Sequence, residues 1–303
     1  MRPKILLSKC YFEPVRYNGS IVNDDFINKL KKHIDFISLC PEVEIGLGVP
    51  RQKLIVKETK DSKRLFQPDT DKDFTEKIIE FTDKALTYLT EVDGFILKAK
   101  SPSCGVGSAK IYRDGAIIGK TYGFFADAIR KRFPYLPLED EGGLKDKKLR
   151  QHFLTRIFAF SELRKILKNP EPKKLVHFHS KYKYLLLTYH QKTLKDLGQL
   201  VADGSLPLNE KIEKYKVKFY EAFLQKPTIK RHANTLMHIL GHVSRKLSPK
   251  EREHLITLIN KYSEGQMQIR VIIELLKNLA YSFGSDYKLI KTYLEPYPME
   301  LDE

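Results

Sequence analysis

Three cysteines are the residues of this chain whose type and spacing most clearly suggest chemistry. Cys10, Cys40 and Cys104 each lie at or near the end of a short apolar run that we predict to be a β-strand. The three runs are residues 4–8, 36–39 and 94–99. Because the carboxyl ends of parallel strands share one edge of a sheet, where ligands bind, we expect the three thiols to meet at one crevice.

Three thiolates at one crevice suit a metal. A structural zinc site takes four ligands, usually in short pairs such as C-x₂-C, and this chain has neither the fourth cysteine nor a pair. An iron–sulfur cluster held by thiolates fits better. With three cysteines, one iron of a four-iron cluster would lack a protein ligand and could bind a substrate as a Lewis acid. Three unrelated buried thiols are the alternative interpretation.

The segments around the cysteines carry a family resemblance. They read KCY at 9–11, CPEV at 40–43 followed by GLGVPR at 46–51, and KSPSCG at 100–105. This set resembles the thiouracil desulfidase family over about residues 1–150. The resemblance implies a small α/β domain with a [4Fe-4S] cluster ligated by all three cysteines. The remainder resembles the YbgA-type helical domain, and the fused pair is similar to the tRNA 4-thiouridine desulfidases.

The resemblance also implies two catalytic residues, Glu42 and Ser101. Glu42 is two residues from Cys40 and could take a proton from water as general base, whereas its alternative is a solvated loop charge. Ser101 lies three residues before Cys104 in a proline turn, where its hydroxyl could orient a pyrimidine or relay a proton. The alternative is a serine that only stabilises the turn, and Ser103 competes for either role.

The net positive charge of the chain indicates what kind of partner it binds. The formal net charge is +16. Residues 1–150 carry 28 basic and 22 acidic residues (+6), and residues 151–303 carry 26 and 16 (+10). The last nine residues hold four acids and no base, so 151–294 alone is +14. Such a surface favours a polyanion, which the resemblance implies is thiolated tRNA. An anionic membrane surface and a merely basic protein are the alternatives.

Two lysine-rich stretches interleave bases with aromatic residues, a pattern that can grip phosphates and stack exposed bases. The four lysines that we expect to contact phosphates are Lys181, Lys183, Lys214 and Lys218. The aromatic residues between them also have helical spacing, which favours a place in a helical core.

The order of apolar patterns predicts two domains. Strands and helices alternate in the first half, ending in a hairpin about the turn at 113–115 and a helix at 124–133. This predicts an α/β domain, 1–145, with a mostly parallel, Rossmann-like sheet. A charged stretch, 138–148, reads as the linker to an all-α domain, 150–303. Its helices are expected at 149–168, 173–202, 209–225, 228–246, 249–263, 267–281 and 285–294.

No apolar run approaches the roughly 18 residues that span a bilayer. The N-terminal apolar run is too short for a secretory signal, so we expect a cytoplasmic protein, without membrane contact and with no protein partner evident. We therefore predict hydrolytic, non-redox removal of sulfur from 4-thiouridine in tRNA, giving uridine and sulfide. One alternative is a desulfidase for free thiouracil or another thiolated nucleobase. The other is a non-catalytic iron–sulfur regulator that binds nucleic acid.

Overall fold

The computed structural model describes residues 2–60, 62–243, 247–283 and 287–302. The chain divides into two compact units, Met1–Ser161 with Glu300–Glu303, and Glu162–Met299. The first unit is α/β and the second is helical, which confirms the predicted fold class. The division falls inside helix α5 (Lys147–Lys168), whereas we had expected the limits 1–145 and 150–303.

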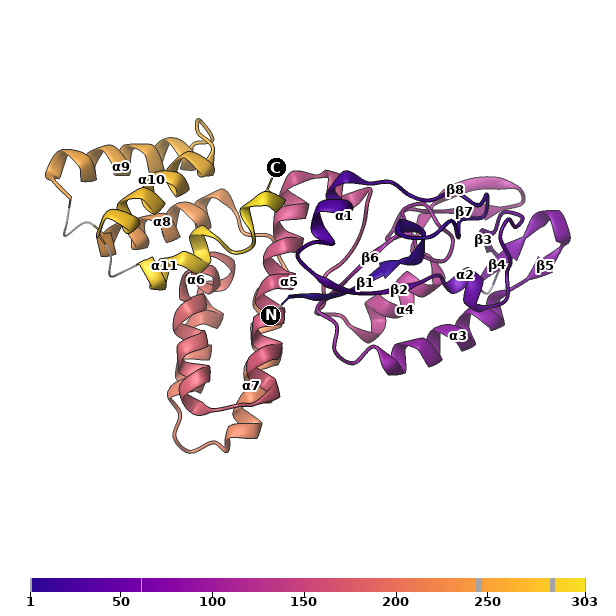
Figure 1. Ribbon diagram of the computed structural model, residues 1–303, viewed down its shortest axis with the longest axis horizontal. Helices are drawn as coiled ribbons and strands as arrows, with labels where there is room; N and C mark the ends of the chain where they lie inside the picture. Colours follow the sequence, from indigo (N-terminus) through magenta and orange to yellow (C-terminus); the bar gives the residue numbers. More distant parts are fainter. Residues whose placement is uncertain (1, 61, 244–246, 284–286, 303) are drawn as a thin grey trace. The chain divides into compact units, whose positions relative to one another are not determined.

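A parallel sheet of four strands organises the first unit (Figure 1). Its order is β2-β1-β6-β9, and every neighbouring pair is parallel. The strands are β1 (Lys4–Ser8), β2 (Asp35–Leu39), β6 (Gly94–Leu97) and β9 (Leu138–Asp140). The central strands β1 and β6 are buried along most of their length, as expected of parallel strands covered on both faces. In register, Ser8 pairs with Leu39 and Leu97 with Asp140, so the strands end at one common edge.

Strand β9 corrects one prediction. We had predicted a linker over 138–148, but Leu138–Asp140 pairs with β6 and Gly143–Lys145 forms a 3-10 turn. Two of the three residues of β9 are acidic, so local composition disfavours a strand. Pairing with a neighbour, rather than intrinsic preference, decides such short strands.

A second sheet, which the sequence patterns did not predict, has the order β5-β4-β3-β7-β8. Only β3 and β7 pair in parallel. Its strands are β3 (Ile55–Glu58), β4 (Lys63–Gln67), β5 (Lys72–Asp73), β7 (Ala109–Arg113) and β8 (Ala116–Thr121). The predicted hairpin is confirmed as β7 and β8. Asp114 and Gly115 both have positive φ, 49° and 81°, as tight hairpin turns require.

Helices complete the first unit. They are α1 (Asp25–Leu30), α2 (Pro41–Glu44), α3 (Thr75–Tyr88), α4 (Phe124–Arg132) and the start of α5. Helices α3 and α4 pack together beside the parallel sheet (Figure 1). Leu86, Phe125 and Ile129 from these helices join Leu6 and Phe95 of the sheet in one core. Each fully buried side chain of this size stabilises the fold by about 1.5–3 kcal/mol.

The second unit contains the predicted helices. They are α6 (Pro172–Ala202), α7 (Leu208–Ala222), α8 (Ile229–Val243), α9 (Pro249–Ser263), α10 (Ile269–Phe283) and α11 (Tyr287–Leu294). The predicted extensions at 244–246 and 285–286 lie outside the described residues. Helices α6 and α7 form a hairpin whose core includes Phe178, Tyr182, Tyr215 and Phe219 (Figure 1). No helix within the described ranges is both long and apolar enough to cross a bilayer.

The start of α4 rests against the loop that carries Cys104. The N–H of Phe125 donates to the carbonyl oxygen of Ser103 over 2.9 Å, which satisfies one of the helix's otherwise unpaired N–H groups. Gly123 approaches this loop closely. A Cβ atom there would lie 2.5 Å from the carbonyl carbon of Ser103 and 2.7 Å from the amide nitrogen of Cys104, so the loop would have to move.

We therefore expect Gly123→Ala to lower the free energy of unfolding by about 1–3 kcal/mol, the usual cost of overpacking. Urea denaturation measures this value. The control is Gly48→Ala in the same unit, because Gly48 is exposed and nothing lies within 4 Å of its added Cβ. Equal losses for the two variants would contradict the close-approach argument.

A partly buried histidine, His232, predicts how the stability of the second unit depends on pH. Nδ1 of His232 lies 3.0 Å from the hydroxyl oxygen of Tyr293, and burial lowers the pKa of His232 to about 4. In the unfolded chain a histidine has a pKa of about 6.5, so the unfolded state takes up the proton first as the pH falls. The stabilisation present above pH 6.5 is then lost progressively towards pH 4, by at most about 1.4 kcal/mol per pH unit. Urea denaturation of wild type and His232→Gln at several pH values tests this, since the variant should have the shallower slope.

Candidate active site

The three cysteines surround one cavity at the carboxyl edge of the parallel sheet. Cys10 lies in the 3-10 turn after β1, Cys40 is the residue before α2, and Cys104 is in the loop after β6. All three line a cavity of about 430 Å³, a size typical of small-molecule sites. The tertiary structure thus brings together three residues that are up to 94 positions apart in the sequence.

Burial sets the protonation of the thiols. Burial, followed by the effect of the neighbouring Cys40, raises the pKa of Cys10 to about 12. Burial also raises the pKa of Cys40, partly offset by the backbone N–H of Val43, and raises that of Cys104 well above its usual value. Without a bound cation the three thiols therefore hold their protons at neutral pH. A metal that binds here must release those protons, which couples binding to pH.

The thiols suit a cluster better than a single ion. A lone zinc ion needs all its sulfur ligands about 2.3 Å away. Among the described residues, no group of three His, Cys, Asp or Glu side chains could hold one metal ion. In an iron–sulfur cluster each thiolate binds a different iron, so the thiols need only surround one space. Three thiols around one cavity meet that requirement.

Glu42 is a buried, ion-paired carboxylate in this cavity. The whole residue is 9% exposed, which rules out a solvated loop charge. Its Oε2 accepts hydrogen bonds from Nε and Nη2 of Arg51, at 2.9 and 2.7 Å. Its Oε1 faces the hydroxyls of Ser103 at 3.0 Å and Ser101 at 3.3 Å. Arg51 therefore anchors one carboxylate oxygen and leaves the other towards the two serines.

The two candidate serines occupy different places. Ser101 lines the cavity, and its Oγ also accepts the backbone N–H groups of Ser103 and Cys104, at 3.2 and 3.1 Å. Ser101 therefore both stabilises its turn and contacts Glu42. Ser103 is fully buried and lies outside the cavity lining. The geometry favours Ser101 as the serine that can touch a ligand.

Sequence reasoning missed Arg51 as part of the site, although it ends the GLGVPR segment. The side chains of Arg51 and Glu42 are only 6% and 11% exposed. Nη1 of Arg51 also donates to the carbonyl oxygens of Val15 and Gly48, at 3.0 and 3.2 Å. One guanidinium thus ties two loops to the carboxylate. The sequence signal that could have identified Arg51 is that it is the first basic residue after the CPE motif.

A second missed group, Glu141, follows β9, in the stretch that was expected to be the linker. Its carboxylate accepts the hydroxyl of Tyr11 at 2.9 Å and the backbone N–H of Ala99 at 2.6 Å, and it pairs with the Lys98 ammonium. Tyr11 adjoins Cys10, so Glu141 connects the first cysteine turn to the segment after β6.

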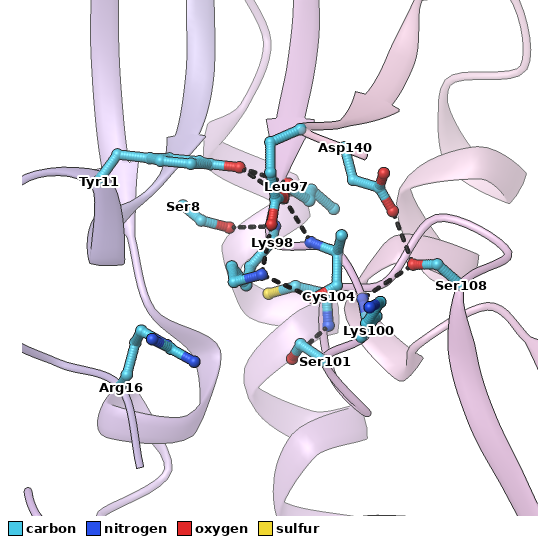
Figure 2. Close-up of polar contacts among 12 residues, drawn as sticks. Ser8, Tyr11, Arg16, Leu97, Lys98, Lys100, Ser101, Cys104, Ser108 and Asp140 are labelled. Carbon is cyan, nitrogen blue, oxygen red and sulfur yellow. Dashed lines mark hydrogen bonds and ion pairs between the residues drawn. The ribbon is translucent and has the colours of Figure 1, made fainter. Parts of the chain in front are cut away.

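Asp140 secures the other cysteine loop. Its carboxylate accepts the hydroxyl of Ser108 at 2.6 Å (Figure 2). It also accepts the backbone N–H groups of Val106 and Gly143, at 3.2 and 2.9 Å. The Ser108 oxygen in turn accepts the backbone N–H of Lys100, which has the unusual φ of 62°. The two adjacent carboxylates therefore hold the protein loops on both sides of the cavity.

The first unit is thus an α/β domain in which three thiols, a carboxylate and a hydroxyl share one cavity. In agreement with this arrangement, residues 5–141 match the model of the 2-thiouracil desulfurase family. Residues 183–298 match a model described as a protein of unknown function, DUF1722. The two halves of the chain are thus similar to two different family models, in agreement with the two resemblances that the sequence motifs indicated.

Two individual proteins are similar to parts of this chain. The uncharacterized protein YbgA of Escherichia coli (strain K12) is 26% identical over 148 residues, which are 48% of this chain and 88% of that protein. A solved structure titled "[4Fe-4S]-dependent thiouracil desulfidase TudS" is 25% identical, with a TM-score of 0.39. That match covers 48% of this chain and 95% of the other.

The Glu42–Arg51 pair predicts a large effect on stability. Removing one partner of a buried ion pair leaves an uncompensated charge and typically costs about 3–5 kcal/mol. We expect Arg51→Met to lower the free energy of unfolding by this amount, measured by urea denaturation. Adding Glu42→Gln to Arg51→Met should recover part of the loss, because the orphaned charge is then gone.

The matched control is the exposed pair of Lys84 and Glu80, whose side chains are both 70% exposed. Lys84→Met should change the free energy of unfolding by less than about 1 kcal/mol. A loss in Arg51→Met no larger than in this control would show that the pair is not buried as described.

Proposed function

We propose that this protein is a [4Fe-4S]-dependent desulfidase that replaces the sulfur of a thiolated pyrimidine by the oxygen of water. The cavity carries this proposal, because it gathers Cys10, Cys40, Cys104, Glu42 and Ser101 in one place. The match of residues 5–141 to the 2-thiouracil desulfurase model supports the same reaction class. The reaction is balanced as thiocarbonyl plus water giving carbonyl plus hydrogen sulfide, with no net electron transfer.

Each side chain of the cavity has a part in this chemistry. A cluster with three protein ligands would supply a Lewis-acidic iron for the thiocarbonyl sulfur. Glu42 takes the proton from the attacking water at Oε1, the oxygen that Arg51 leaves free. Ser101 hydrogen-bonds the pyrimidine or relays the proton, since its hydroxyl already contacts that same oxygen. Ser103 holds the carboxylate from the buried side.

Free thiouracil is the substrate that the family match favours. A specific observation keeps 4-thiouridine in tRNA as the second candidate. Lys100 and Lys110 line the cavity, and neither has a carboxylate partner within the part of the chain that the structure describes. Cations at a cavity mouth can bind the phosphates that flank a nucleobase.

The lysines that we expected to bind phosphate in the second unit are less available than the sequence suggested. Lys181 pairs with Glu162 at 2.6 Å, Lys214 with Glu210 at 2.5 Å and Lys218 with Asp196 at 3.8 Å. Such pairs are worth only about 0–1 kcal/mol, so a phosphate could displace the carboxylates. Lys183 lies 5.6 Å from the ring centre of Tyr184. A tRNA-binding role for these lysines stays a proposal.

Anaerobic purification with iron analysis, followed by sulfide release from 2-thiouracil, 4-thiouracil, 4-thiouridine and thiolated tRNA, tests the proposed function. Wild type should contain about four irons per chain, and any one Cys→Ser change should damage the cluster and abolish sulfide release. Ser101→Ala and Glu42→Gln should keep the iron but lower turnover, by roughly 10²-fold or more for the general base. Ser103→Ala is compared with Ser101→Ala, because both hydroxyls contact Oε1 of Glu42 but only Ser101 lines the cavity.

Substrate preference decides between the candidates. Turnover of the free bases alone would support a thiouracil desulfidase, whereas a preference for tRNA that fades with salt would support the second candidate. Iron content without sulfide release from any of the four substrates would overturn the proposal and favour a non-catalytic iron–sulfur regulator.

A further inference from the structure

Arg16 places a guanidinium in the cavity wall, and among the residues that the structure describes no carboxylate pairs with it. Its side chain lines the cavity, and Figure 2 shows its nitrogens pointing towards the side occupied by Cys104 and Ser101. Its Nη1 donates to the hydroxyl oxygen of Ser20 at 2.7 Å, and the guanidinium lies 5.9 Å from the ring centre of Tyr17. Both partners are neutral. A guanidinium has five N–H donors, so most of its hydrogen-bonding capacity faces a ligand or solvent.

Lys53, Lys100 and Lys110 also line the cavity, but each offers a single ammonium rather than a planar guanidinium, and three further cations are held by carboxylates. Arg51 is held by Glu42, Lys98 by Glu141 and Lys9 by Glu13. Among the described residues that line the cavity, Glu42 is the only acidic one, and its Oε2 is already bound by Nε and Nη2 of Arg51. The positive charge of Arg16 is therefore available to an acceptor on the ligand.

The shape of the expected substrate tells which acceptor this is. Both 2-thiouracil and 4-thiouracil carry one thiocarbonyl and one carbonyl group, separated by a single ring nitrogen. If the sulfur faces the three thiols, the carbonyl oxygen, which leaves the ring two atoms further on, diverges from the sulfur and meets another part of the cavity wall. A planar guanidinium in the cavity wall, such as that of Arg16, is well suited to bind that oxygen.

We propose that Arg16 is a substrate-binding residue that hydrogen-bonds the ring carbonyl oxygen of the thiopyrimidine, the oxygen that the reaction does not exchange. This inference rests on the proposed function. As the oxygen of water bonds to the thiocarbonyl carbon and the carbon–sulfur bond breaks, electron density rises on the ring. A charged donor at the carbonyl oxygen stabilises that density. Arg16 thereby selects thiolated pyrimidinones over thiolated rings that lack the oxygen.

Arg16 also has a structural role, which the test must separate from substrate binding. It lies in the turn that leads to Gly19, whose φ is 70°. Its backbone carbonyl accepts the N–H of Gly19 at 2.9 Å, and its side chain bonds Ser20. Ser20→Ala removes this side-chain hydrogen bond while keeping the guanidinium. It is therefore the matched control for Arg16→Met.

The test compares 4-thiouracil with pyrimidine-4-thione, which keeps both ring nitrogens but lacks the carbonyl oxygen. Iron-loaded wild type, Arg16→Met, Arg16→Lys and Ser20→Ala are assayed for sulfide release, with iron content checked. We expect Arg16→Met to lower kcat/KM for 4-thiouracil by about 10- to 100-fold, the range of a hydrogen bond to a charged group. For pyrimidine-4-thione the loss should stay below about threefold. Arg16→Lys should recover only part of the activity, and Ser20→Ala should resemble wild type.

Binding of uracil, measured by calorimetry, gives a readout that does not depend on turnover. Arg16→Met should weaken uracil binding by a similar factor at unchanged iron content. Equal losses for the two substrates, or unchanged uracil affinity, would overturn the role of Arg16. If wild type releases no sulfide from either substrate, the proposed function itself fails, and uracil affinity alone then decides whether Arg16 binds a ring carbonyl.

Discussion

The common edge of the parallel sheet is the constraint on which the site depends. The order β2-β1-β6-β9 places four strands side by side, and their register ends them together. Parallel strands send their following loops to the same side. Cys10, Cys40 and the loop of Cys104 therefore meet without any local sequence motif that joins them. A strand inserted between β1 and either neighbour would separate the thiols, so the site depends on strand order as directly as on the cysteines.

Buried carboxylates then give these loops defined positions. Glu42 is held by Arg51, Glu141 by Lys98 together with Tyr11, and Asp140 by a hydroxyl and two backbone N–H groups. A buried charge is costly unless it is fully paired. Each carboxylate therefore penalises any loop arrangement that removes a partner. Such networks contribute little net stability compared with an apolar core, but they hold the loops around the cavity in one geometry.

The two units differ in how deeply their ion pairs are buried. The first unit buries its important ions, where a missing partner is expensive. In the second unit three of the four lysines singled out in the sequence form partly exposed pairs that cost little to exchange. Pairs of that kind can be broken without unfolding the unit, whereas the ion pairs around the cavity are buried and fixed. The two segments also match different family models.

The sequence alone determined the helices of the second unit, the β7–β8 hairpin and the placing of the cysteines near strand ends. These features follow from local periodicity, from turn residues such as Asp114 and Gly115, and from three short motifs. Only the tertiary structure decided that Glu42 is buried rather than solvated, and that Ser101 rather than Ser103 lines the cavity. It alone showed that Asp140 and Glu141 hold the site rather than a linker. The physical reason is that burial, ion pairing and the pairing of a short acidic strand such as β9 depend on partners far away in the chain. Residue type and local pattern do not predict which distant residues those partners are.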